Sequence, residues 1–95
     1  MLLPYVLEHN ASAVSHKLNR LTRLLDLPES GDMAFVAWVQ DLNAQLSIPA
    51  RLKDLGIQEA DIPDIAALAM RDTEHHTNPR EMTQADFEEI LQRAL

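Results

Sequence analysis

The residues most able to do chemistry in this sequence are concentrated in the stretch Asp72–Arg80, which reads DTEHHTNPR. It places two adjacent histidines, His75 and His76, among two acids and an arginine. Because proline disfavours helical backbone at the residue before it, Asn78-Pro79 predicts a break in any helix that reaches this stretch. A break that carries imidazoles, carboxylates and a guanidinium is a candidate functional site.

Three interpretations of His75 and His76 are open. The imidazoles could cap carbonyl groups at the C-terminal end of the preceding helix, where positive charge is favoured. They could instead contribute to a substrate cleft that other protein completes. They could also form a self-contained metal site with Asp72, provided that the helix continued for one more turn and placed the three on a shared face.

The end of the stretch predicts a rigid corner between two helices. Asn78 can hydrogen-bond the backbone two residues on, Pro79 has a fixed φ, and Arg80 can donate to carbonyls or a carboxylate. We therefore expect Asn78, Pro79 and Arg80 to structure the loop and to hold the histidines toward a neighbouring surface.

Composition limits the classes of function. A length of 95 residues predicts one domain, 1–95, and a net charge of -7 argues against nucleic acid or anionic lipid as a partner. No apolar run is long enough for a membrane span, and the lack of cysteine is compatible with a reducing compartment, so we expect a cytoplasmic protein. Two glycines cannot form a glycine-rich phosphate cradle, and no catalytic residue can be assigned.

The hydrophobic pattern predicts an all-α fold, a single compact bundle of five or six helices, with no strand. Apolar residues recur at spacings of three and four, and the expected helices cover residues 4–9, 12–25, 32–46, 50–55, 62–72 and 84–95. The main apolar stripes are Val14, Leu18, Leu21 and Leu25; then Phe35, Val39, Leu42 and Leu46, widened by Val36 and Trp38; and finally Phe87, Ile90, Leu91 and Leu95.

Local signals set the expected helix ends. Asn10 should stop the first helix, and Ser12 should cap the second. Gly56 is well placed as a left-handed stop, and Thr83 with Asp86 resembles a capping box. The helix that begins at Ile62 is apolar nearly all round and so expects neighbours on more than one side.

Other polar residues are interpreted as structural. His9 and His16 each stand alone, at a helix end or on a polar face. Lys17, Arg20 and Arg23 follow a period near three, which is typical of a solvated helix face.

The chain resembles the C-terminal end of the iron-containing (group III) alcohol dehydrogenases. Six pieces occur in the same order and approximate spacing, namely Leu2-Leu3-Pro4-Tyr5-Val6 with Asn10, Ile48-Pro49 with Leu52, Leu55-Gly56-Ile57, Glu59-Ala60-Asp61-Ile62-Pro63, Asp72, and Thr77-Asn78-Pro79-Arg80. The resemblance implies an N-terminal α/β domain that binds NAD(P), and a helical C-terminal domain whose metal (iron or zinc) is held by an Asp and three His. It also implies that the loop at Asp72–Arg80 approaches the catalytic cleft, with His75 near substrate or nicotinamide.

None of His9, His16, His75 and His76 matches a family ligand position, and the nucleotide-binding segments are missing. We therefore expect no metal site and no cofactor on this chain, which would be a fragment inactive without an upstream dehydrogenase domain. The alternative is a small acidic interaction module that self-associates as a homo-oligomer through an exposed apolar face.

Overall fold

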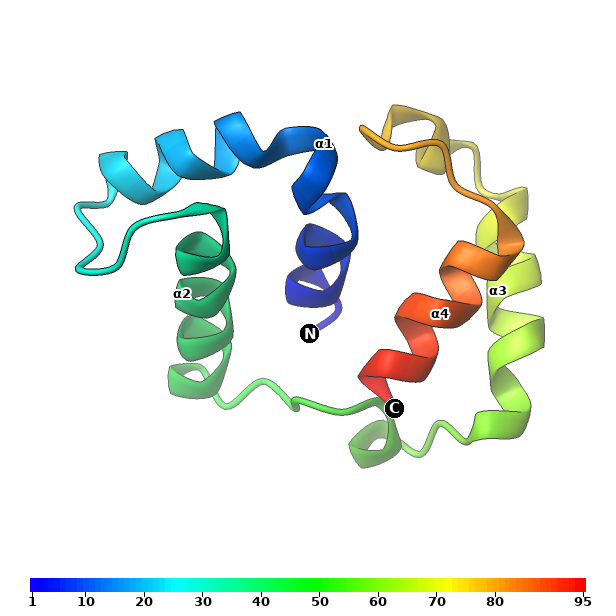
Figure 1. Ribbon diagram of the computed structural model, residues 1–95. Helices are drawn as coiled ribbons and strands as arrows, with labels where there is room; N and C mark the ends of the chain where they lie inside the picture. Colours follow the sequence, from blue (N-terminus) through cyan, green and yellow to red (C-terminus); the bar gives the residue numbers. More distant parts are fainter. The chain divides into compact units, whose positions relative to one another are not determined.

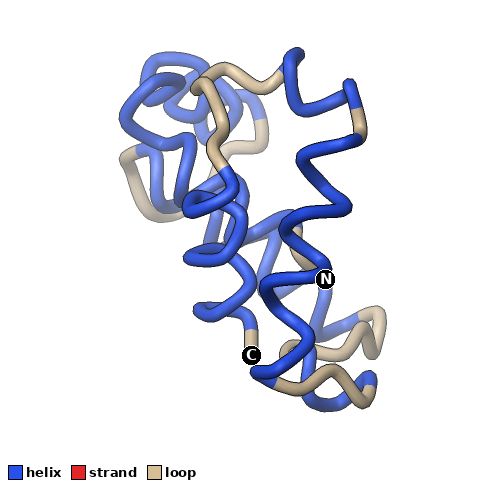
Figure 2. The backbone as a smooth tube through the Cα atoms, turned by 90° about the vertical axis from the view of Figure 1, so that its right-hand side faces the viewer, coloured by secondary structure: helices blue, strands red, loops and turns tan.

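The computed structural model describes all 95 residues and is built of helices, without strands (Figures 1 and 2). The predicted all-α class is confirmed. The elements are α1 (Leu3–Leu24), α2 (Asp32–Gln45), η1 (Leu52–Leu55), η2 (Glu59–Asp61), α3 (Ile62–Arg71), η3 (Thr73–Thr77) and α4 (Gln84–Ala94), where η marks a 3-10 helix. The first two predicted helices are joined in α1, the predicted helix 50–55 corresponds to η1, and η2 and η3 are additional to the prediction.

The chain divides into two compact units, Met1–Ile48 and Pro49–Leu95. The first consists of α1 packed on α2, and the second has α3 packed on α4, with the three 3-10 helices in its connections. The expectation of a single domain stays a prediction.

The predicted break at Asn10 and Ser12 is wrong. Helix α1 runs through both residues and bends instead at Val14, whose φ of -128° and ψ of 17° are not helical (Figure 1). Val14 is β-branched and tolerates this more extended φ. Asn10 is only 5% exposed, so burial holds it in the helix despite its local preference for a helix end.

The buried Thr22 stabilises the turn before α2 through hydrogen bonds of its hydroxyl group. The Thr22 hydroxyl lies 3.1 Å from the carbonyl oxygen of Leu18 and 3.0 Å from that of Gly31, so its single proton is shared between two acceptors. Gly31 has a φ of 105°, and α2 begins at Asp32 as predicted. The Asp32 carboxylate accepts a hydrogen bond from the Met33 amide at 2.9 Å.

Burial in the first unit follows only part of the predicted stripes. Leu18 and Val39 are buried as expected, but Val36, expected only to widen its stripe, is the most deeply buried large side chain. Leu46 is 62% exposed because α2 ends at Gln45, one residue earlier. Phe35 and Trp38 stay half-buried and stack on each other, with ring centroids 5.8 Å apart.

The second unit begins with two short turns that its own residues close. Gly56 takes a left-handed φ of 84° after η1, as predicted, and the Ile57 amide donates to the Leu52 carbonyl at 3.2 Å. The Gln58 amide donates to the carboxylate of Asp61 at 2.8 Å, which fixes the entry into α3. This second turn was not anticipated from the sequence.

The core of this unit lies where α3 packs on α4. Its buried apolar residues are Leu52, Ile62, Ala66, Met82, Ile90, Leu91 and Ala94. The predicted capping box is confirmed, since the Thr83 hydroxyl accepts from the Asp86 amide at 3.2 Å and the Thr83 amide donates to the Asp86 carboxylate at 2.8 Å. The Arg51 guanidinium also donates to the Arg93 carbonyl near the end of α4, at 3.1 Å.

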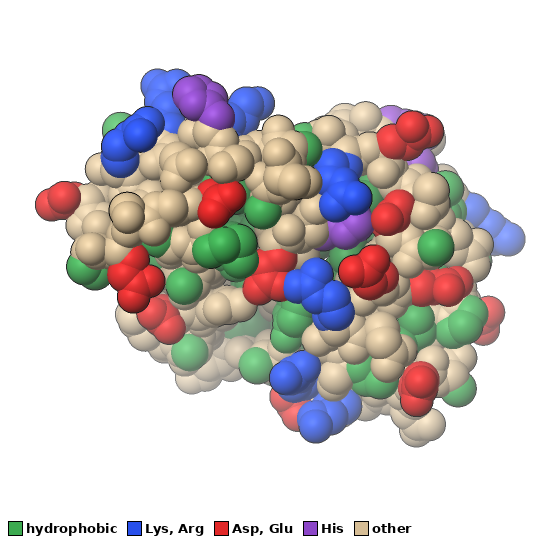
Figure 3. Space-filling view, in the orientation of Figure 1, with side chains coloured by type: hydrophobic (Ala, Val, Ile, Leu, Met, Phe, Trp, Pro, Cys, Tyr) green, Lys and Arg blue, Asp and Glu red, His purple; other side chains and the backbone are tan.

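No helix has the combination of length and hydropathy that crossing a membrane requires. The basic side chains Lys17, Arg20 and Arg23 are exposed together with His16, and Figure 3 shows basic groups gathered over the part of α1 that follows the bend. The exposure of all three cations agrees with the interpretation of a solvated face.

Candidate functional site

The candidate site is the connection between α3 and α4, which lies entirely within the second unit. Helix α3 ends at Arg71, and Asp72 leaves it with an extended ψ of 125°. The Asp72 carboxylate accepts a hydrogen bond from the Glu74 amide at 3.0 Å and so caps η3. The segment predicted as an irregular loop is therefore largely a capped 3-10 helix.

Two further hydrogen bonds hold this helix in place. The Thr77 hydroxyl donates to the Glu74 carbonyl at 2.8 Å, and the Asn78 amide donates to the His75 carbonyl at 3.1 Å. Both bonds span three residues, which is the hydrogen-bond spacing of a 3-10 helix.

The corner after η3 contains one of the hydrogen bonds that the sequence predicted. Nδ2 of Asn78 donates to the carbonyl oxygen of Arg80 at 2.8 Å, a bond to the backbone two residues on. Asn78 has an extended ψ of 139°, the conformation that a following proline requires. The backbone bond of Asn78 is therefore confirmed, whereas the use of Arg80 as a donor stays a prediction.

The two imidazole rings lie against each other and against α4. Their ring centroids are 4.1 Å apart, and the ring of His75 meets that of Phe87 edge to face at 6.0 Å. His75 is half-buried, while His76 is exposed. One ring is thus fixed by packing on α4, and the other is open to solvent.

Both histidines border an open depression of about 410 Å³. Its lining residues are two histidines, two methionines, an asparagine and a glutamate, namely Met70, His75, His76, Asn78, Glu81 and Met82. The sequence singled out the histidines and Asn78 but missed Met70, Glu81 and Met82. The sequence does show one methionine on each side of the loop. That both line the same depression becomes evident only when the turn between α3 and α4 is known.

The proposed metal site of Asp72, His75 and His76 is not supported. It required α3 to continue for another turn, but α3 ends at Arg71 and the Asp72 carboxylate is used as a helix cap. The other two interpretations of the histidines remain predictions.

The four histidines do not fit the ligand set of an Asp and three His that the resemblance implies. The first unit contains His9, which is 7% exposed, and His16, which is exposed on the other side of the bend in α1. The second unit contains only His75 and His76. Neither unit therefore contains by itself the three histidines of that ligand set.

The two glycines of the chain have structural positions. The two glycines, Gly31 and Gly56, have positive φ and serve as the start of α2 and the end of η1. Glycine-rich phosphate sites instead place several glycines between a strand and a helix, and this structure has no strand. The chain therefore has no glycine-rich phosphate site of that kind, and the expectation that it binds no cofactor stays a prediction.

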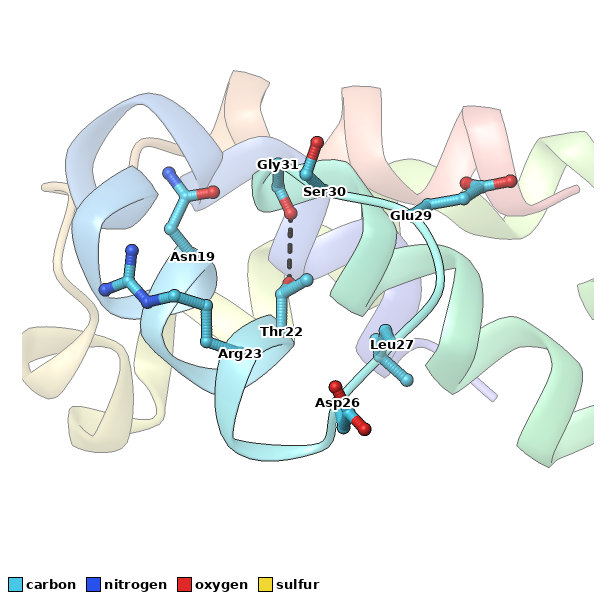
Figure 4. Close-up of a pocket in the computed structure, with 8 residues that line it drawn as sticks. All are labelled: Asn19, Thr22, Arg23, Asp26, Leu27, Glu29, Ser30 and Gly31. Atoms are coloured by element: carbon cyan, nitrogen blue, oxygen red, sulfur yellow. Dashed lines mark hydrogen bonds between the residues drawn. The ribbon is translucent and has the colours of Figure 1, made fainter.

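A second hollow, of about 270 Å³, lies at the C-terminal end of α1. Its lining is Asn19, Thr22, Arg23, Asp26, Leu27, Glu29, Ser30 and Gly31 (Figure 4). The dashed bond in Figure 4 joins the Thr22 hydroxyl to the Gly31 carbonyl across the hollow. Asp26 has a left-handed φ of 51°, so this hollow is a product of the tight turn.

Comparison with known proteins gives one consistent result. Residues 1–95 match the family model described as the Fe-containing alcohol dehydrogenase family, C-terminal. The chain is 31% identical over 99 residues to 4-hydroxybutyrate dehydrogenase of Cupriavidus necator, and 33% identical over 100 residues to lactaldehyde reductase of Escherichia coli strain K12. These alignments cover 100% and 99% of the chain.

The fold gives the same answer. A crystal structure of 1,3-propanediol oxidoreductase matches 99% of this chain with a TM-score of 0.89 and 27% sequence identity. The matched part is 26% of that chain, and it is 25% and 26% of the two curated relatives. The chain thus spans about a quarter of the length of the proteins it resembles.

Proposed function

Because the chain belongs to the Fe-containing alcohol dehydrogenase family and matches its C-terminal part, we propose that it is the helical fragment of a metal-dependent, NAD(P)-linked alcohol dehydrogenase, inactive by itself. Hydride transfer in such an enzyme needs a nicotinamide as the hydride carrier and a Lewis acid to polarise the alcohol oxygen. The observation that carries the proposal is that the match covers the whole chain but only about a quarter of each relative.

The purified chain itself tests this proposal. We expect no NAD(P)-linked oxidation of alcohols or reduction of aldehydes above a protein-free control, and no stoichiometric iron or zinc by elemental analysis. Far-UV circular dichroism of the same sample establishes that the helices are formed. Turnover that rises in proportion to the amount of this chain would overturn the proposal.

The substrates of the complete enzyme would be small oxygenated alcohols and aldehydes. The relatives are named for 4-hydroxybutyrate, lactaldehyde and 1,3-propanediol, which are short carbon chains with a second oxygen function. We place His75 and His76 at the edge of the substrate cleft, since they line the depression beside α4 and can donate hydrogen bonds to such an oxygen.

A chimera tests the role of the histidines. This chain would replace the matching C-terminal quarter of the Escherichia coli lactaldehyde reductase, and His75→Ala and His76→Ala would be compared with His16→Ala, an exposed histidine of α1. We expect a several-fold rise in KM for the aldehyde in the first two variants only. Equal effects of all three would remove the histidines from the substrate cleft.

Self-association is a second candidate function. Several large apolar side chains stay exposed, namely Leu24 (70%), Leu46 (62%), Leu68 (61%), Leu55 (57%) and Leu3 (55%). Contact with another copy or with an upstream dehydrogenase domain would bury these side chains. Size-exclusion chromatography with light scattering should then show a homo-oligomer, whereas a monomer over a wide range of concentration would contradict this candidate.

We also propose that the protein works in the cytoplasm. A dehydrogenase linked to NAD(P) needs the soluble nicotinamide pool, and a chain without cysteine is compatible with a reducing compartment. Cell fractionation followed by immunoblotting would test this, and recovery outside the cytoplasmic fraction would contradict it.

A further inference from the structure

The depression beside η3 collects donors that a soft metal cation prefers. Two of the four methionines and two of the four histidines of the chain lie within 13 residues, Met70–Met82, and all four line this one depression. Thioether and imidazole groups together favour copper(I) over calcium, magnesium or manganese, which prefer oxygen ligands. We propose that Met70, His75, His76 and Met82 form a binding site for a soft monovalent cation, copper(I), with silver(I) as its redox-inert analogue.

The spacing of the imidazoles suits a shared cation. Nitrogen–metal bonds of about 2 Å place two nitrogens on the same ion at most about 4 Å apart. The centroids of His75 and His76 are 4.1 Å apart, so the two rings are direct neighbours at the depression. Because the edge contact with Phe87 holds His75 on α4, binding of one ion by both requires the exposed ring of His76 to turn.

The thioethers come from the two walls of the depression. Met70 lies in the last turn of α3 and is half-buried, and Met82 is 7% exposed just before the cap of α4. Packing in the core explains why Met82 is apolar. Core packing does not explain why Met70, which is half-buried, and His76, which is exposed, line the same depression. Binding of one ligand by both residues would explain it.

The remaining groups are consistent with a cation of this class. Glu81 is exposed at the same depression and adds one negative charge that attracts cations. Asp72 does not line the depression, and one oxygen of its carboxylate caps η3. The chain has no cysteine, so no thiolate competes for the ion. The site needs only residues of the second unit, and it does not depend on the proposed dehydrogenase role.

Methionine methyl resonances report the site directly. The chain would be labelled at its methionine methyl groups. One sample would receive copper(I), kept reduced with ascorbate under anaerobic conditions. A parallel sample would receive silver nitrate in chloride-free buffer. We expect the signals of Met70 and Met82 to shift until one equivalent of cation is present, with Met33 as an unaffected internal control. Shifts that are absent, or that are largest at Met1 or Met33, would overturn the proposal.

Ligand variants provide a second, quantitative measurement. Affinity would be measured in competition with a chromogenic copper(I) chelator for two double variants, His75→Asn with His76→Asn and Met70→Leu with Met82→Leu. Each double variant should bind copper(I) at least about tenfold more weakly, since loss of even an outer-shell group commonly costs 10–100-fold in metal affinity. Control variants His16→Asn and Met33→Leu should bind as the parent chain does. Unchanged copper(I) affinity in a folded variant with both histidines replaced would overturn the proposed site. If the methionine variant failed to fold, the methyl shifts of the parent chain would still show whether Met70 and Met82 bind the cation.

Discussion

Removal of the side-chain cap of α4 is the most direct test of how this structure is held together. In Thr83→Ala the hydroxyl that accepts from the Asp86 amide at 3.2 Å and donates to the Asp86 carboxylate at 2.7 Å is lost. The backbone amide of Thr83 still donates to that carboxylate, so only the hydroxyl bonds disappear. The substitution therefore isolates one half of the capping box.

The expected magnitude follows from the position of the cap. Replacing a helix N-cap by alanine costs about 0.5–2 kcal/mol, and here water can reach the freed amide because Thr83 is exposed, so we expect about 1 kcal/mol. Helix α4 carries the buried side chains Ile90, Leu91 and Ala94, so fraying at its start weakens the contact with α3. For a domain of this size 1 kcal/mol lowers Tm by about 4–8 °C.

The assay is urea and thermal unfolding followed by far-UV circular dichroism at pH 7, with Thr83→Ser as the matched control. Serine retains the hydroxyl, and it caps at least as well as threonine, so this control should unfold like the parent chain. Helix α4 also positions Phe87 against His75, and the His75 ring signals should therefore broaden or shift in Thr83→Ala alone. If Thr83→Ala matched the parent chain, or if Thr83→Ser lost as much stability, the hydroxyl would not be the stabilising group.

Two further substitutions test the core and a turn. Ile90 is 4% exposed, so Ile90→Ala should lower the free energy of unfolding in urea by about 2–5 kcal/mol. Leu24 is 70% exposed, so Leu24→Ala should change that free energy by less than about 0.5 kcal/mol. Similar losses in the two variants would contradict the burial pattern. Gly56→Ala should cost about 1–2 kcal/mol in the same assay because the φ of Gly56 is 84°; no atom lies within 4 Å of an added Cβ, so the cost comes from the backbone conformation and not from a clash. Gly56→Asn should cost less, since asparagine adopts the left-handed conformation more readily. An alanine variant as stable as the parent would refute the left-handed stop.

Features that depend on a few neighbouring residues were predicted correctly. The cap of Thr83 with Asp86, the stop at Gly56 and the start of α2 at Asp32 each involve groups within three residues of one another. The bond from Asn78 to the backbone two residues on belongs to the same class. The residues of such interactions are held close together by the chain itself, so residue type and spacing can predict them where tertiary packing does not oppose them.

Features that depend on distant packing were predicted poorly. Asn10 should have ended a helix, but it is buried and α1 bends at Val14. Periodicity placed Leu46 on the apolar stripe of α2, yet it is exposed because the helix ends before it. In each case the gain from tertiary burial, or its absence, outweighed a local preference that is small per residue.

The sequence by itself determined the helical class, the family resemblance and the bond from Asn78 to the Arg80 carbonyl, because spacing, capping and proline chemistry act along the chain. Only the tertiary structure decided what surrounds the histidines. The turn between α3 and α4 brings Met70 and Met82 to the same depression as His75 and His76, and it commits Asp72 to a helix cap. These outcomes depend on how two helices pack, which residue spacing does not encode.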